Sequence, residues 1–478
     1  MLETVCRRLT LSRRELLVLV AAFGLSLPAV TPRIYASDEI QYFSYLRSIW
    51  FDRDVSFENE YQYFYDRSIG RGEGFHATFL EQYTDAGMRP SFATVGSAIL
   101  WSPFYLGGHV VARAGGYEAD GFSYPYVAAV AYGSAFYGFA AVLLSIAAAR
   151  RLAGLTAPKP EGAGGPGMLA GVLVLIGTPL LFYMYVSPPY SHACSAFAVA
   201  VFVTVWLHVR QSWTIRGAIL LGLSGALMAM VREQDAFLAL GPALDFAFQH
   251  SKGLAFDPDQ PGATTVARRL SIALAGCVAF ALGVVPQLLA YKALNGHYSP
   301  STLVTRKMSW NAPHALDVLG SPQHGFFVWT PLAVFALAGL IALAVRGSRN
   351  VRPVAVCALI MVGLQIYVSG SVESWTVAGA FGQRRFVALT VLLTIGIAAF
   401  VNAVPRGTLR TVAGVALALC VWWNVALMTA FGVGLMDRQR LEPRRNAYVA
   451  FVTLPPMLPD LAYRYLFNRD SFYSQERH

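Results

Sequence analysis

The chain has 478 residues, of which 55% are hydrophobic and 13% are charged, and its mean hydropathy is +0.48. A soluble protein could not bury that much apolar surface in its core, so the composition excludes a soluble domain and predicts an all-α protein with many membrane crossings. The formal net charge of +10 comes mostly from arginines scattered between apolar segments, which favours membrane orientation over nucleic-acid binding. We therefore expect contacts with membrane lipids and no nucleic acid.

Apolar segments of roughly 18 to 25 residues recur along the chain, and each can span about 30 Å of hydrocarbon as a helix. About eleven crossings are predicted on this basis, near residues 15–34, 124–149, 168–186, 193–209, 216–231, 235–249, 270–291, 326–345, 353–370, 386–403 and 409–434. Most basic residues fall in connections on the side of the basic N-terminus. The positive-inside rule predicts that this side is cytoplasmic.

With this orientation, residues 35–122 form the first extracytoplasmic loop, residues 293–325 form another, and residues 435–478 form an extracytoplasmic tail. Within the first loop, Ser91 to Val111 is apolar enough to cross the membrane but contains Pro103 and Gly107-Gly108. A crossing there would move every later arginine-rich loop outside. We therefore expect an interfacial or re-entrant helix at this place.

The first loop opens with a predicted amphipathic helix. Ser37 and Asp38 are residue types that cap helices. The apolar residues that follow share one face of a helix, with polar residues elsewhere, and they are Phe43, Leu46, Ile49 and Trp50. Such a helix is expected to lie on the membrane surface.

Four short motifs carry a resemblance to a known group. They are Ser37-Asp38-Glu39, Arg89-Pro90 with the later Ile99-Leu100-Trp101-Ser102-Pro103-Phe104, Ser321-Pro322-Gln323-His324-Gly325, and Gly382-Gln383-Arg384-Arg385-Phe386. Together with the predicted topology, they resemble the GT-C-fold glycosyltransferases that use polyprenyl-phosphate sugars, which include protein O-mannosyltransferases and aminoarabinose transferases. Bacterial relatives look most similar.

The resemblance implies one GT-C-like domain over residues 1–478, in a bacterial inner (plasma) membrane, with an extracytoplasmic active site. It also implies a polyprenyl-phosphate sugar as donor. The chain lacks the large lumenal insert of protein O-mannosyltransferases, which favours a lipid or glycan acceptor over a protein.

Sugar transfer from such a donor needs a base for the acceptor hydroxyl and cations for the departing phosphate. We interpret Asp38 as the base, because it follows the first crossing, and Glu39 as the residue that orients Asp38 or the acceptor. The alternative is that Asp38 only caps the helix. The candidates for binding phosphate are Arg384, Arg385, Arg306, Lys307 and Arg232. Salt bridges are the alternatives: Arg384 and Arg385 could pair with Glu373 or with the acidic outer loop, and Arg232 could pair with Asp235.

Asp52 and Asp54 form an Asp-x-Asp pattern, which holds a divalent ion in other sugar transferases. If residues 38–52 are one helix, this pattern lies about 21 Å from Asp38, too far to share a reacting carbon. A charge-balanced turn that contacts the acceptor is the favoured interpretation. Because a phosphate monoester leaves as a stable anion, no cofactor is expected to be required, and a divalent metal remains the less favoured alternative.

Further candidates for substrate contacts are His192, His324, Trp310 and Trp375. Each has an ordinary alternative, as a hydrogen-bonding histidine or as a tryptophan of the membrane interface. We interpret the protein as an inverting glycosyltransferase. Two rivals stay open: a transporter or flippase for a lipid-linked sugar, and a glycan polymerase or ligase that uses a diphosphate-linked donor.

Overall fold

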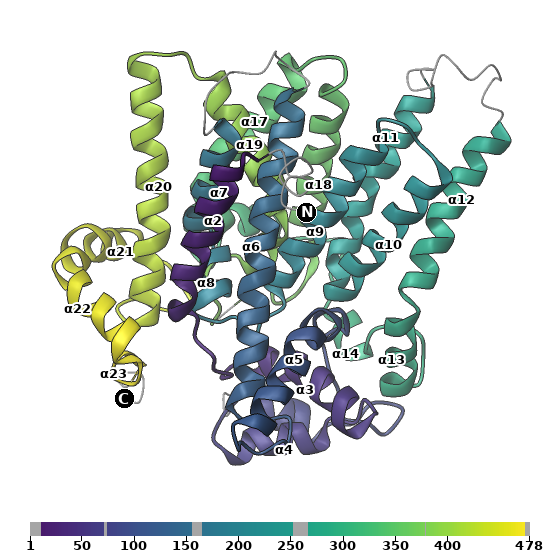
Figure 1. The fold of residues 1–478 in the computed structure, drawn as a ribbon, viewed down its shortest axis with the longest axis vertical. Helices are drawn as coiled ribbons and strands as arrows, with labels where there is room; N and C mark the ends of the chain where they lie inside the picture. Colours follow the sequence, from purple (N-terminus) through teal and green to yellow (C-terminus); the bar gives the residue numbers. More distant parts are fainter. Residues whose placement is uncertain (1–10, 71–73, 155–164, 252–265, 378, 474–478) are drawn as a thin grey trace. The chain divides into compact units, whose positions relative to one another are not determined.

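The computed structural model describes residues 11–70, 74–154, 165–251, 266–377 and 379–473 (Figure 1). The regular elements in these residues are helices. The described residues divide into two compact units. Unit 1 draws on Met1–Ala29, Phe139–Phe182 and Ser309–His478, and unit 2 draws on Val30–Gly138 and Tyr183–Met308.

Six helices of the described chain are long and apolar enough to cross a membrane, which makes this a multi-pass membrane protein. These candidate spans are Tyr124–Leu152, His192–Val209, Val266–Gly283, Arg352–Ser371, Arg384–Ala403 and Thr408–Gly432. Three shorter apolar helices accompany them, Pro166–Gly177, Ile215–Val231 and Leu332–Arg346. All nine overlap predicted crossings, so the many-crossing, all-helical part of the prediction is confirmed.

Several predicted crossings are interrupted helices. Residues 168–186 form α7 (Pro166–Gly177) and α8 (Leu180–Tyr185), and between them Thr178 is extended, as expected for the residue before Pro179. Residues 270–291 form α12 (Val266–Gly283) and α13 (Val285–Asn295), where Pro286 lies in the first turn of the second helix. Proline therefore sets these breaks, which hydropathy alone does not register.

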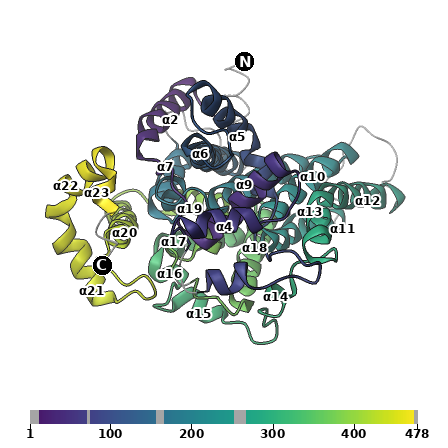
Figure 2. The ribbon, with the colours of Figure 1, turned by 90° about the horizontal axis from the view of Figure 1, so that it is seen from below.

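Unit 2 contains the first extracytoplasmic loop predicted from the sequence and a bundle of apolar helices. The loop holds α3 (Ser37–Arg47), η2 (Ser48–Asp52), α4 (Glu58–Asp66), η3 (His76–Leu80) and α5 (Gly96–Ala114). The bundle holds α9 (His192–Val209), α10 (Ile215–Val231), η4 (Glu233–Ala239), α11 (Leu240–Ser251), α12 and α13, followed by the short α14 (Thr302–Thr305). Within it, α10 packs against both α9 and α12 (Figure 2). The long helix α6 (Tyr124–Gly154) contributes its first half to this unit.

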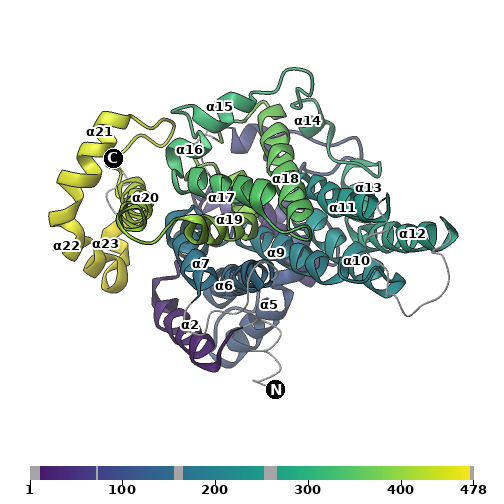
Figure 3. The same cartoon turned by 90° about the horizontal axis from the view of Figure 1, so that it is seen from above.

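Unit 1 is organised around α19 (Thr390–Ala403), which packs against α7 and α17 (Leu332–Arg346; Figure 3). A Cβ on Gly339 of α17 would lie 1.8 Å from the carbonyl oxygen of Gly396, so glycine is required for this close approach. The other helices are α2 (Arg13–Ser26), η1 (Leu27–Ala29), α15 (Ala315–Gly320), α16 (Phe326–Trp329), α18 (Arg352–Ser371), η5 (Arg384–Leu389) and α20 (Thr408–Gly432).

The C-terminal segment of unit 1 is helical as well. It forms α21 (Pro443–Tyr448), η6 (Val449–Thr453), α22 (Leu454–Phe467) and α23 (Arg469–Tyr473), which Figure 1 shows beside α20. Tyr465 donates a hydrogen bond of 2.8 Å to the carbonyl of Ala29, and Arg469 donates one of 2.6 Å to that of Pro28. These bonds fix the segment to the end of η1.

The helix that opens the first loop differs from the prediction. Gln41 and Ser44 of α3 are as buried as Phe43 and Leu46, because α4 and α5 pack against the helix. The polar face of α3 is therefore covered as well as its apolar face, whereas the amphipathic pattern predicted a polar face without cover. Its sequence has an amphipathic pattern, but other parts of the loop cover the polar face.

Candidate functional site

The predicted site residues divide between the two units. Unit 2 holds Asp38, Glu39, Asp52, Asp54, His192, Arg232, Arg306 and Lys307. Unit 1 holds Trp310, His324, Trp375, Arg384 and Arg385.

Glu39 is fully buried and holds the start of α3 in place. One carboxylate oxygen accepts hydrogen bonds from the backbone N–H groups of Tyr35 and Ala36, at 2.9 and 3.1 Å. The other accepts one of 2.6 Å from the hydroxyl of Ser187. Burial raises the pKa of Glu39 to about 7, although these three hydrogen bonds act in the opposite direction. The cap predicted for Ser37 and Asp38 is thus supplied by Glu39.

Asp38 stands one residue earlier, in the first turn of α3, and is half-buried. A carboxylate at a helix N-terminus is stabilised by the positive end of the helix dipole. Because the neighbouring Glu39 is bonded on both oxygens, the backbone that carries Asp38 has a fixed position. A fixed carboxylate with part of its surface exposed can accept a proton from a bound hydroxyl.

Arg232 and His192 meet at the same end of unit 2, because α9 and α10 are consecutive antiparallel helices. Arg232 donates a hydrogen bond of 2.6 Å to Nδ1 of His192, which requires that nitrogen to be an unprotonated acceptor. The predicted bridge from Arg232 to Asp235 is replaced by other contacts: Asp235 accepts from the Ser195 hydroxyl at 2.6 Å, and Arg232 donates to Gln234 at 3.3 Å.

The start of α5 lies directly against the end of α10. A Cβ on Gly96 would come within 2.4 Å of the backbone of Met230 and Val231, so only glycine allows this contact. The hydroxyl of Thr94 donates a hydrogen bond of 2.8 Å to the carbonyl of Val231. The backbone N–H of Val95 donates one of 2.8 Å to the side chain of Gln287 on α13. The first loop, α10 and α13 are thereby joined around Arg232.

Sequence reasoning did not identify Ser187, Thr94 or Gln287 as part of this end of unit 2. Each makes its contact with a residue more than 100 positions away, so no local pattern marks it. The charged run that begins at Arg232 was the one signal in the sequence, because charge close to an apolar helix needs a partner or a function.

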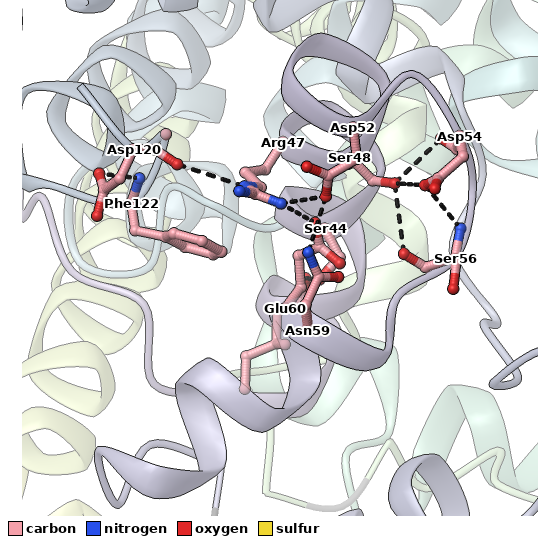
Figure 4. A network of polar contacts seen from close by, with 12 residues as sticks. Ser44, Arg47, Ser48, Asp52, Asp54, Ser56, Asn59, Glu60, Asp120 and Phe122 are labelled. Carbon is pink, nitrogen blue, oxygen red and sulfur yellow. Dashed lines mark hydrogen bonds and ion pairs between the residues drawn. The ribbon is translucent and has the colours of Figure 1, made fainter.

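The carboxylates of Asp52 and Asp54 bind different partners (Figure 4). Asp52 pairs with Arg47 and accepts a hydrogen bond of 2.8 Å from Asn59. Asp54 accepts hydrogen bonds from the hydroxyl of Ser48 at 2.6 Å and from the backbone of Ser56 at 3.1 Å. The pattern thus closes a turn after a helix that runs without interruption from α3 into η2, and the contact with the acceptor stays a prediction.

Arg47 is the centre of this network. Its guanidinium also donates to the buried Glu60 at 3.0 Å, and it lies 4.6 Å from the ring centroid of Phe122. One guanidinium therefore bridges two carboxylates in this part of the loop. Among the described residues, no group of three or more histidine, cysteine, aspartate or glutamate side chains is arranged to hold a metal.

The other predicted phosphate-binding pair in unit 2 lies at the end of α14. Arg306 and Lys307 are both exposed, and the ammonium of Lys307 lies 5.6 Å from the ring centroid of Phe92. They are accessible cations with few constraints on their side chains.

In unit 1, Arg384 and Arg385 begin η5 and have different surroundings. Arg385 is buried and donates to the carbonyl and the hydroxyl of Ser374, at 3.1 and 3.2 Å. Arg384 is half-buried and close enough to His324 to affect its protonation. The buried Gln383, which precedes both arginines, donates to the backbone carbonyls of His324 and Trp375. The two sequence motifs that contain His324 and Arg384 are thus brought together.

His324 is fully buried and stacks on Trp329, with ring centroids 4.6 Å apart. Its Nε2 lies 2.8 Å from the carbonyl of Ala380 and must donate to it, which leaves Nδ1 unprotonated. Burial is the main reason that the pKa of His324 falls to about 4, so this side chain is neutral near pH 7.

The two tryptophans that were predicted to contact substrate are more exposed than His324. Trp375 stacks on His314 with ring centroids 5.3 Å apart, and Trp310 is 39% exposed. The backbone of Trp310 accepts a hydrogen bond of 2.7 Å from Tyr367. Both indoles have surface available for a ligand.

Neither a family model nor a curated protein matches this sequence. The fold is similar to two solved structures of the oligosaccharyltransferase of Archaeoglobus fulgidus. One is AglB in complex with an inhibitory peptide and a dolichol-phosphate, with 14% identity and a TM-score of 0.44. The other is the enzyme in the apo form, with 13% identity and a TM-score of 0.43. Each match covers 96% of this chain and 56% of the solved chain, so this chain spans about half the length of those proteins.

Proposed function

We propose that the protein is an inverting glycosyltransferase of GT-C type, which moves a sugar from a polyprenyl-phosphate donor to an acceptor hydroxyl. The reaction would take place on the extracytoplasmic side of a bacterial inner membrane. The observation that carries the proposal is the half-buried Asp38 at the start of α3, beside Glu39, which is bonded on both oxygens. In the sequence, the pair follows α2, the first helix among the described residues.

In this mechanism, the Asp38 carboxylate removes the proton from the acceptor hydroxyl as its oxygen attacks the anomeric carbon. A new carbon–oxygen bond forms while the bond from the anomeric carbon to the phosphate oxygen breaks. The electron pair leaves with the polyprenyl phosphate. A single displacement inverts the configuration at the anomeric carbon. Glu39 has a positioning role, because its hydrogen bonds hold the first turn of α3.

The departing phosphate needs cations. Arg232 is supported by its place in the same unit as Asp38 and by its neutral partner His192, which leaves the positive charge of Arg232 available. Arg384 and Arg385, and also Arg306 and Lys307, are proposed as further phosphate contacts. Because arginine and lysine can stabilise a phosphate monoester, the mechanism uses no metal.

We propose six further side chains as contacts with the sugar and the acceptor. Trp310 and Trp375 offer aromatic faces on which a sugar can stack. His192 and His324 are proposed as neutral hydrogen-bonding groups, and Asp52 and Asp54 as contacts for the acceptor at the rim of the first loop. A lipid or a glycan is the proposed acceptor class.

The test is the composition of the cell envelope in a strain that lacks the gene, measured by mass spectrometry of its glycans and lipids. We expect one sugar to be missing from one glycan or lipid and to return with a plasmid-borne wild-type copy. An unchanged envelope would contradict the proposal. A lipid-linked sugar trapped on the cytoplasmic leaflet would indicate a flippase, and accumulation of a diphosphate-linked glycan would indicate a polymerase or ligase.

A further inference from the structure

The helices near the end of unit 1 have no role in the proposed mechanism. The elements α21, η6 and α22 follow one another without a break, so the backbone is helical from Pro443 to Phe467, and we call this stretch the C-terminal helix. One side of it packs on unit 1: η6 contacts α20, and the side chains of Val449, Leu454 and Leu461 are buried. The other side is exposed.

The exposed side of the C-terminal helix carries large apolar side chains. Val452 and Tyr463 are eleven residues apart, which is about three helical turns, so the apolar residues around each of them share one side of the helix. A helix that is apolar on both sides is unfavourable in water, so the exposed side needs an apolar partner of its own. The side chains that are each at least 45% exposed are Tyr448, Phe451, Val452, Tyr463, Leu466 and Phe467.

Contacts fix the C-terminal helix at one end of α20. This candidate membrane span ends at Gly432, and the ring of Phe472 in α23 would lie 3.6 Å from a Cβ on that glycine. Tyr465 is bonded to the carbonyl of Ala29, just after α2 in the first predicted crossing. Figure 1 shows α21 to α23 beside the C-terminal half of α20. Because a span ends where hydrocarbon meets the lipid headgroups, we expect the C-terminal helix at the level of that interface.

Arginines lie beside the exposed apolar side. Residues 437–445, between α20 and the first turn of the C-terminal helix, hold four arginines and two acidic residues. Arg440 and Arg444 are exposed, and no hydrogen bond or ion pair occupies their guanidinium groups within the described chain. Arg444 comes one helical turn before Tyr448, so a cation and an exposed aromatic ring share one side of the helix.

This combination of apolar side chains and free cations selects among partners. A second copy of the chain, docked through the same surface, would bring its own Arg440 and Arg444 against those of the first copy, and the like charges would repel. A phospholipid fits both features. Its acyl chains cover the apolar side chains, and its phosphate oxygens accept hydrogen bonds from the guanidinium groups. Long arginine side chains can reach the headgroups while their stems stay on the apolar surface.

We propose that the C-terminal helix binds the bilayer surface, with acyl chains on its exposed apolar side and the phosphates of anionic phospholipids on Arg440 and Arg444. The partner is a phospholipid of the bilayer with a net negative headgroup, of which phosphatidylglycerol is an example. None of the residues on this surface takes part in the proposed sugar transfer. The surface can therefore bind lipid whether or not the protein is a glycosyltransferase.

The test is the quenching of a fluorophore by brominated lipids, in nanodiscs that each hold one full-length protein. Bimane is attached to Tyr448→Cys in a protein that also carries Cys6→Ser and Cys277→Ser, because the remaining three cysteines are buried. Tyr448 is 63% exposed, so its replacement should leave the melting temperature unchanged. Bromines on the acyl chains quench bimane only at close range, so the signal reports which lipid covers this side of the helix.

We expect brominated lipids to quench the label and phosphatidylglycerol to be preferred. In discs that contain both lipids, the binding constant of phosphatidylglycerol relative to phosphatidylcholine should be about fivefold or more, as for arginine near an anionic surface. Arg440→Gln combined with Arg444→Gln should bring this ratio close to one. Arg406→Gln combined with Arg410→Gln is the matched control, because these two exposed arginines lie at the opposite end of α20. The control should keep the wild-type ratio.

A second label, on Phe467→Cys, tests the other end of the C-terminal helix. Phe467 is 75% exposed, and bimane at this position should be quenched as well. Bimane at Tyr448→Cys that neither lipid quenches would overturn the contact with the bilayer. Equal quenching by the two lipids would refute the binding of anionic headgroups. A preference for phosphatidylglycerol that survives Arg440→Gln combined with Arg444→Gln would refute the assignment of those two arginines.

Discussion

Replacement of Glu39 tests how the start of α3 is held. Glu39→Ala removes the acceptor of three hydrogen bonds, from Tyr35, Ala36 and Ser187, in a fully buried position. Each donor left without a partner costs roughly 1 to 3 kcal/mol, so we expect a loss of about 3 kcal/mol or more of unfolding free energy. Glu39→Gln keeps an oxygen for the two backbone N–H groups, and its NH₂ group can donate to the Ser187 hydroxyl. It should cost much less.

The stability of the wild type and of Glu39→Gln should also depend differently on pH. The folded state raises the pKa of Glu39 from 4.5 to about 7, so it favours the protonated form. The contribution of Glu39 to stability is therefore complete below pH 4.5 and is lost as the pH rises through 7. The full change is roughly 3 kcal/mol. Glu39→Gln has no such titration, so its stability relative to the wild type should rise by up to this amount between pH 4.5 and 8.

Thermal unfolding in nanodiscs, followed by intrinsic fluorescence at several pH values, measures both effects. Glu118→Ala serves as the control, because that side chain is exposed. Parallel pH profiles for the wild type and Glu39→Gln would refute the burial argument. Equal stability of the Ala and Gln variants would refute the role of the three hydrogen bonds.

Three more predictions concern packing, metal and phosphate. Gly96→Ala should lower stability by about 1 to 3 kcal/mol, because its Cβ would meet the backbone of α10, whereas Gly107→Ala, with open space around it, should be neutral or stabilising in thermal unfolding. Sugar transfer should continue in a chelator; loss of activity in chelator that returns with added divalent ion would revive a metal site at the turn that contains Asp52. Arg384→Ala should raise the donor KM roughly tenfold, as for one lost charge-assisted contact, and an unchanged KM would assign the phosphate to other cations.

The sequence predicts the helical, multi-pass character of the chain well, because hydropathy and helix length are local properties. It also places the Asp38 pair at the start of a helix and Asp52 at the end of the same helical run, as found. It does not predict that α3 is buried on both faces. That burial depends on how distant segments cover its polar side, and periodicity within one helix carries no information about it.

The candidate site is likewise predicted from the sequence only in part. A charged or aromatic residue type marks Arg232 and Trp375 in the sequence. The partners that give such residues their properties come from elsewhere, as Ser187 does for Glu39 and Val95 does for Gln287.

The most direct test of the account is the rate of sugar transfer by the purified protein, with the donor and acceptor that the envelope analysis identifies. Asp38→Asn should reduce the rate at saturating donor and acceptor at least 100-fold, in the range expected for loss of a general base, while donor binding stays close to that of the wild type. Glu118→Gln should transfer sugar at the wild-type rate. A folded Asp38→Asn protein that transfers sugar as fast as the wild type would contradict the assignment of Asp38 as the base.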